Sequence, residues 1–95
     1  MPKCDKLLSR ARENPGSLRF EEACALAECW GYVKKDSKQK GGSHRKFKHA
    51  KLKLPKVEAM CSFQEHNGMA KPYQVRQLLE KIEYIETNHP DYQPT

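Results

Sequence analysis

The sequence predicts an α+β fold in two layers, in which helices cover one face of a three-stranded antiparallel sheet. Apolar residues recur at helical spacing over residues 5–13, 18–30 and 72–88, and three strand-like segments lie between the second and third of these. Helices and strands that are segregated along a chain are typical of α+β domains. The 95 residues fit a single domain, residues 1–95, with a small core.

Two helices are expected before the sheet. Residues 5–13 have one narrow apolar side made by Leu7, Leu8 and Ala11, and proline and glycine in residues 14–17 end this helix. Residues 1–17 are therefore an N-terminal helical extension. The second helix, residues 18–30, is capped by Ser17 and ends at Gly31. Its apolar stripe, with Trp30 as a core residue, consists of Phe20, Ala23, Ala27 and Trp30.

The predicted strands are residues 32–36, 43–49 and 59–64, with a polar hairpin loop over residues 37–42. Side chains alternate between the two faces of a strand. In the second strand, one face carries Ser43, Arg45, Phe47 and His49, and the other carries His44, Lys46 and Lys48. We expect Phe47 in the core, and His49 as a partly buried residue rather than a second catalyst.

The connection to the third strand gives a weaker signal. Leu52 and Leu54 alternate with lysines, which favours an extension of the second strand as far as Pro55. In the third strand, Cys61 and Phe63 share a face. Residues 65–68 are expected to form a turn, so that His66 reaches a site on the second strand only if the fold brings it there.

The last helix has the clearest pattern, and Pro72 fits its first turn. Its apolar stripe is Val75, Leu78, Leu79, Ile82 and Ile85. Its solvated face is expected to hold Arg76, Glu80, Lys81, Glu83 and Glu86. Residues 89–95 are expected to form a flexible tail.

Charge is concentrated in the middle of the chain. Residues 34–56 carry a net charge of +9, whereas the rest of the chain carries −3. A basic segment between acidic flanks favours a surface that binds a polyanion in a salt-sensitive way. The alternative is a solvated lysine-rich loop.

The segment with the most chemical potential is residues 41–47, Gly-Gly-Ser-His-Arg-Lys-Phe. Imidazole can exchange a proton near neutral pH, so His44 is the candidate general acid or base. Glycine lets a phosphate approach the backbone closely, a serine hydroxyl can orient it, and cations can stabilise developing charge. The candidate phosphate-binding residues are Gly42, Ser43, Arg45, Lys46 and Lys48.

The first residues lack the apolar core of a signal peptide, which favours the cytoplasm. The four cysteines are scattered, so we expect them to be reduced and to serve mainly in packing. No segment approaches the roughly 20 apolar residues of a membrane span. Acidic residues near the basic segment are too few for a magnesium site, and we expect no cofactor. A zinc site that combines Cys24, Cys29, Cys61 and a histidine stays open.

The order of the elements after residue 17 is α-β-β-β-α, the architecture of double-stranded-RNA-binding domains. The chain also resembles the HicA-type toxins, the messenger-RNA interferases of bacterial toxin–antitoxin pairs. The resemblance rests on Phe20-Glu21-Glu22 before Trp30-Gly31-Tyr32, on Gly-Ser-His-x-x-Phe at residues 42–47, and on Lys71-Pro72-Tyr73-Gln74-Val75 leading into Leu78-Leu79. It implies a small ribonuclease whose key residue is His44 and a HicB-like antitoxin as partner.

Together, these observations and the resemblance predict a metal-independent endoribonuclease that cleaves mRNA. His44 would take the proton of a ribose 2′-hydroxyl or protonate the leaving 5′-oxygen, and Lys46 and Lys48 fit best beside it. Two other classes of function stay open: a non-catalytic RNA-binding module, and a protein-interaction domain whose basic loop meets an acidic partner.

Overall fold

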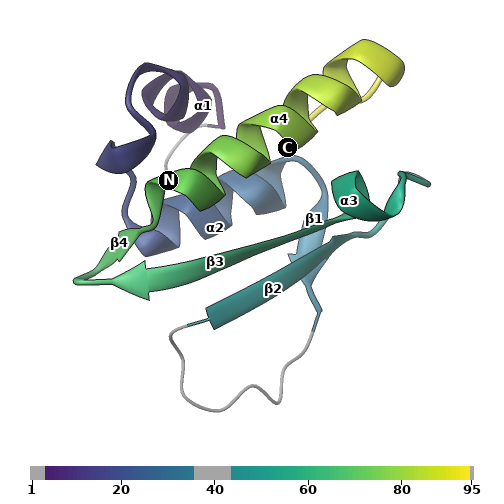
Figure 1. Cartoon of the computed structure of the whole chain (residues 1–95). Helices are drawn as coiled ribbons and strands as arrows, with labels where there is room; N and C mark the ends of the chain where they lie inside the picture. Colours follow the sequence, from purple (N-terminus) through teal and green to yellow (C-terminus); the bar gives the residue numbers. More distant parts are fainter. Residues whose placement is uncertain (1–3, 36–43, 95) are drawn as a thin grey trace.

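The computed structural model describes residues 4–35 and 44–94, and of His44 it describes the backbone alone. The helices are α1 (Cys4–Glu13), the 3-10 helix η1 (Pro15–Ser17), α2 (Phe20–Cys29), α3 (Lys56–Ala59) and α4 (Pro72–Asn88). The strands are β1 (Tyr32–Lys34), β2 (His44–His49), β3 (Met60–His66) and β4 (Met69–Ala70). Helices α2 and α4 lie on one side of the sheet, with α1 beyond them (Figure 1).

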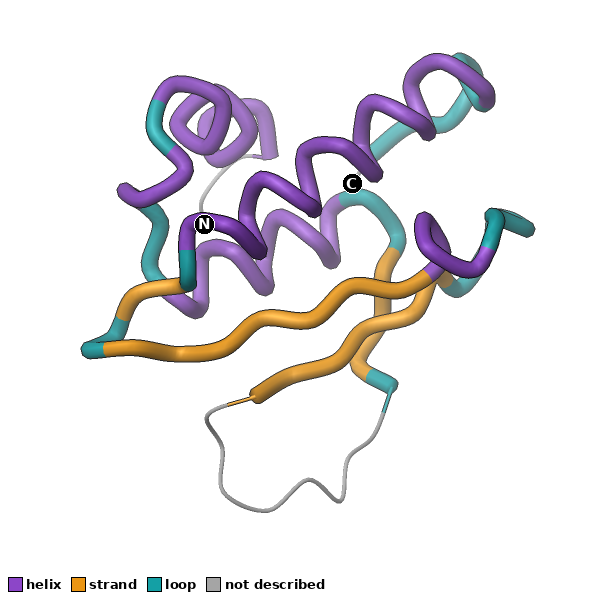
Figure 2. Tube along the Cα trace, in the orientation of Figure 1, coloured by secondary structure: helices purple, strands orange, loops and turns teal. Residues whose placement is uncertain are grey.

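The general α+β class is confirmed, but the number of strands is not the predicted one. The sheet is antiparallel in the order β1-β2-β3-β4, so it has four strands instead of three. Figure 2 shows β3 running the length of the sheet before the chain turns back into β4. The likeness to double-stranded-RNA-binding domains stays a prediction.

The fourth strand arises because the turn after β3 is shorter than the predicted turn over residues 65–68. Strand β3 continues to His66, and only Asn67 and Gly68 make the turn. Both have positive φ, 52° and 82° respectively. Asparagine and glycine tolerate this conformation, which lets a two-residue turn join two antiparallel strands. His66 then pairs with Met69.

The predicted extension of the second strand past residue 49 is wrong. Residues 50–55 lie outside any helix or strand, and the short helix α3 follows. Pro55 has no backbone N–H with which to continue a strand pairing, and it precedes the first turn of α3. Leu52 and Leu54 instead pack, partly buried, against the core.

The core lies between the sheet and the helices. Its largest fully buried side chains include Tyr32, Phe47 and Phe63 from the strands and Leu26 and Ile82 from the helices. The rings of Phe47 and Phe63 meet edge to face with centroids 5.9 Å apart. The predicted core residue Trp30 is buried and stacks on Tyr92, 6.1 Å between centroids. That contact lies in the segment predicted to be a flexible tail, whose flexibility stays a prediction.

The prediction that the cysteines are reduced is wrong for one pair. Cys4 at the start of α1 and Cys29 at the end of α2 form a disulfide, with Cα atoms 5.9 Å apart. The packing of α1 against α2 brings these distant positions together, which sequence spacing does not reveal. Cys24 and Cys61 are free, and burial raises the pKa of their thiols to about 11 and about 12, as expected for packing residues. Within the described residues, no helix is long and apolar enough to cross a membrane.

Candidate nucleic-acid interface

One face of the sheet is turned away from α2 and α4. Strand register puts Val33, Lys48 and Met60 in one row across β1, β2 and β3, and Lys46 beside Ser62 in the next. We call these five residues the open face. Lys46 and Lys48 are exposed, while Phe47 and His49 on the opposite face are buried. The predicted alternation of side chains along β2 is therefore confirmed for residues 45–49.

The described lysines of the basic segment, residues 34–56, are available to bind an anion. All seven described lysines between residues 34 and 56 are exposed: Lys34, Lys35, Lys46, Lys48, Lys51, Lys53 and Lys56. The ion pairs found among the described residues lie elsewhere, between Arg10 and Glu22 (2.6 Å) and between Arg12 and Glu86 (2.9 Å). The hydrogen bond from Arg10 lowers the pKa of the Glu22 carboxyl, with a smaller contribution from the backbone N–H of Arg19. Among the described residues, both ion pairs thus lie within the helices, and these lysines have no ion-pair partner.

His44, the predicted catalytic residue, is located by the position of its backbone. It begins β2 and lies opposite Gln64 of β3. His66 is two residues beyond Gln64 on the same strand, so the fold brings His66 near the position of His44 along the sheet. Gly42 and Ser43, the predicted phosphate-binding residues before it, lie outside the described residues.

Arg45 is separated from the two lysines. Its guanidinium carbon lies 5.2 Å from the ring centroid of Phe20, a cation–π contact with the start of α2. A polar cavity of about 260 Å³ beside it is lined by Arg19, Glu21 and Glu65 as well. Two carboxylates in this cavity make it a poorer place for a phosphate than the open face.

His49 is held by hydrogen bonds on both ring nitrogens. Nδ1 accepts from the backbone N–H groups of Lys51 (3.2 Å) and Leu52 (3.1 Å), so Nε2 carries the proton and donates to the carbonyl oxygen of Trp30 at 2.7 Å. Burial lowers the pKa of His49. The prediction that His49 is buried is confirmed. Both of its ring nitrogens are occupied, which agrees with the prediction that it is not a second catalyst, but that role stays a prediction.

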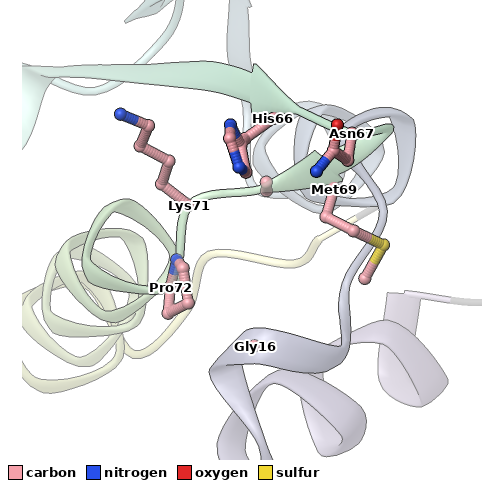
Figure 3. Close-up of a pocket in the computed structure, with 7 residues that line it drawn as sticks. Gly16, His66, Asn67, Met69, Lys71 and Pro72 are labelled. Carbon is pink, nitrogen blue, oxygen red and sulfur yellow. The ribbon is translucent and has the colours of Figure 1, made fainter.

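A cavity of about 390 Å³ lies between the β3–β4 turn and the start of α4. His66 and Lys71 extend from its rim, and Met69 and Pro72 lie between the turn and Gly16 (Figure 3). His66 is exposed and free to reach it. This histidine is closer to the candidate site than the sequence alone indicated.

The predicted position of Lys81 on the solvated face of the last helix is wrong, because only 8% of its surface is exposed. The pattern held a signal, because Lys81 follows Leu78 by three and precedes Ile85 by four, the spacing of the buried stripe. Lys81 and Lys46 line the same cavity, of about 240 Å³, where α4 meets β3.

No group of three or more His, Cys, Asp and Glu side chains within the described part of the chain could hold a metal ion. Comparisons of the chain with protein-family models, with curated proteins and with solved structures find no match.

Proposed function

We propose that the protein binds RNA on the open face and cleaves it, with His44 as general acid or base. The observation that carries the proposal is the pair Lys46 and Lys48, exposed on a sheet face that no described helix covers and free of carboxylate partners among the described residues. Phosphate groups spaced along a strand of RNA are the ligand that such a face fits best.

The proposed reaction needs no metal ion. The base removes the proton of a ribose 2′-hydroxyl, whose oxygen attacks the adjacent phosphorus, and the 5′-oxygen leaves with a proton from an acid. His44 supplies one of these transfers, and the ammonium groups of Lys46 and Lys48 stabilise the extra negative charge on the phosphorane. Gly42 and Ser43 have supporting roles in phosphate binding, whereas Arg45, which packs on Phe20, is left out of the proposed site.

The biological role that goes with this chemistry is that of a toxin of the HicA type, acting on mRNA in the cytoplasm and held inactive by a HicB-like antitoxin. Induced expression should arrest growth, and co-expression of the product of an adjacent antitoxin gene should restore it. Growth that continues at the level of the His44→Ala variant would contradict this role.

The direct test is cleavage of purified RNA in the presence of a chelator. Replacing a general acid or base typically costs about 100- to 10,000-fold in rate, so His44→Ala should fall in that range. Lys6→Ala removes an exposed lysine on α1, on the far side of the helices from the sheet, and as the control it should cleave at nearly the parent rate. If His44→Ala cleaves as fast as the parent, the catalytic role is wrong. Salt-sensitive binding without cleavage by the parent would establish the non-catalytic RNA-binding module instead.

A further inference from the structure

The cavity where α4 meets β3 contains a lysine in an unusual setting. Lys81 is 92% buried, the complement of its 8% exposure. Among the described residues, no carboxylate lies within ion-pair distance of its ammonium group and no hydrogen-bond acceptor is found for it. The ammonium nitrogen is not among the fully buried, unpartnered side-chain atoms of the described residues, so the methylene stem is covered while the charged end stays accessible.

The cavity supplies a route from this lysine to the candidate RNA-binding surface. Strand β4 pairs with β3 only at Glu65 and His66. On the side away from β2, residues 60–62 of β3 therefore have no strand partner among the described residues. The cavity of about 240 Å³ opens there, lined by Lys46 and Ser62 of the open face and by Gln77 and Lys81 of α4. No acidic residue is among those that line it.

We propose that this cavity is a subsite for one phosphate group of the RNA backbone, bound between the ammonium groups of Lys46 and Lys81. The Ser62 hydroxyl and the Gln77 side-chain amide are the neutral donors available to the same phosphate. The proposal rests on the proposed function and extends it, because the subsite would carry the bound strand from the open face to the edge of β3. A phosphate is the occupant that two unpaired cations and no anion favour.

An ordinary packing role for Lys81 gives a different expectation. A lysine can bury its methylene stem and leave its ammonium group at the surface. In that case Lys81→Met would change neither phosphate binding nor the number of ions released on RNA binding. Methionine keeps an unbranched apolar side chain in place of the buried methylene stem and removes only the charge, so Lys81→Met is expected to fold. Lys81→Gln is a second variant that keeps a polar end group.

The test is the affinity of the full chain for a 10-nucleotide oligouridylate, measured by fluorescence anisotropy over a series of salt concentrations. The catalytic variant His44→Ala is the background, so that the oligonucleotide stays intact. Each phosphate contact on a single strand contributes about 0.7 to the slope of log K against log salt concentration. Lys81→Met should lower the slope by about that amount and weaken binding about tenfold at low salt. The matched control, Arg76→Met, removes the same charge from an exposed position on α4 and should leave the slope unchanged.

Inorganic phosphate provides a second readout that does not need RNA binding. In the parent, backbone amide NMR signals of Ser62 and Lys81 should shift on titration with phosphate and stay unchanged with chloride at equal ionic strength, and Lys81→Met should lose the response. Unchanged slope and affinity in Lys81→Met, or no phosphate-specific shift in the parent, would overturn the subsite. If Lys48→Ala loses RNA binding and Lys81→Met does not, the subsite is wrong but the proposed function stands. The two failures are therefore distinguishable.

Discussion

The histidine at the end of β2 offers a test of the packing described above. Replacing His49 by alanine deletes the acceptor for the N–H groups of Lys51 and Leu52 and the donor to the carbonyl oxygen of Trp30. It also deletes the edge-to-face contact with Tyr32, whose centroid lies 5.0 Å from that of the imidazole.

The size of the effect follows from these contacts. Each hydrogen bond contributes about 1 kcal/mol, and a buried group left without a partner costs about 1–3 kcal/mol. Water can reach the exposed Lys51, so that its N–H is partly compensated. The expected loss for His49→Ala is therefore about 3 kcal/mol in the free energy of unfolding.

Urea denaturation followed by circular dichroism measures this loss. The midpoint should fall while the dependence of the free energy on urea concentration stays the same, as for a change in native stability alone. His66→Ala, at an exposed position, is the matched control and should stay within about 0.5 kcal/mol of the parent. A His49→Ala midpoint that coincides with that of His66→Ala would show that these hydrogen bonds do not hold the end of β2.

Three further predictions concern stability. Burial depresses the pKa of His49 below its ordinary 6.5, so as the pH falls the unfolded chain binds a proton at this residue before the folded chain does. The free energy of unfolding should therefore decline below about pH 6.5, by at most about 1.4 kcal/mol per pH unit. The decline should be smaller in His49→Gln. The Cys4–Cys29 disulfide closes a loop of 25 residues, so Cys4→Ser should lower the denaturation midpoint by the equivalent of about 3.5 kcal/mol, and added dithiothreitol should no longer affect this variant. Gly31 has φ +95° and a Cβ there would meet the hydroxyl of Tyr92 and the His49 ring, so Gly31→Ala should lose about 2 kcal/mol or more in the same assay, and a loss below 0.5 kcal/mol would contradict the described packing.

Periodic patterns account for the parts of the fold that the sequence predicted well. The three- and four-residue spacing of Val75, Leu78, Ile82 and Ile85 forms the buried side of α4, and all four are fully buried. The alternation along β2 likewise placed Phe47 in the core and Lys46 and Lys48 on the open face. These results depend only on the geometry of a single helix or strand, which near neighbours in the chain determine.

The parts that were missed depend on contacts between distant segments. Strand β4 exists because His66 and Met69 pair across a two-residue turn, and the pairing of Cys4 with Cys29 depends on how α1 packs on α2. The burial of Lys81 depends on how close α4 comes to β3.

The candidate site divides in the same way. Two features of the site follow from the order of residues alone: positive charge gathers in residues 34–56, and Lys46 and Lys48 share a side of their strand. Three other features depend on how the elements pack. The side with Lys46 and Lys48 faces away from the helices, and Arg45 on the opposite side contacts the ring of Phe20. Lys81, 35 positions further along the chain, lines a cavity with Lys46. The physical reason is that local spacing sets the direction of each side chain, while the packing of the helices on the sheet decides what that side chain meets.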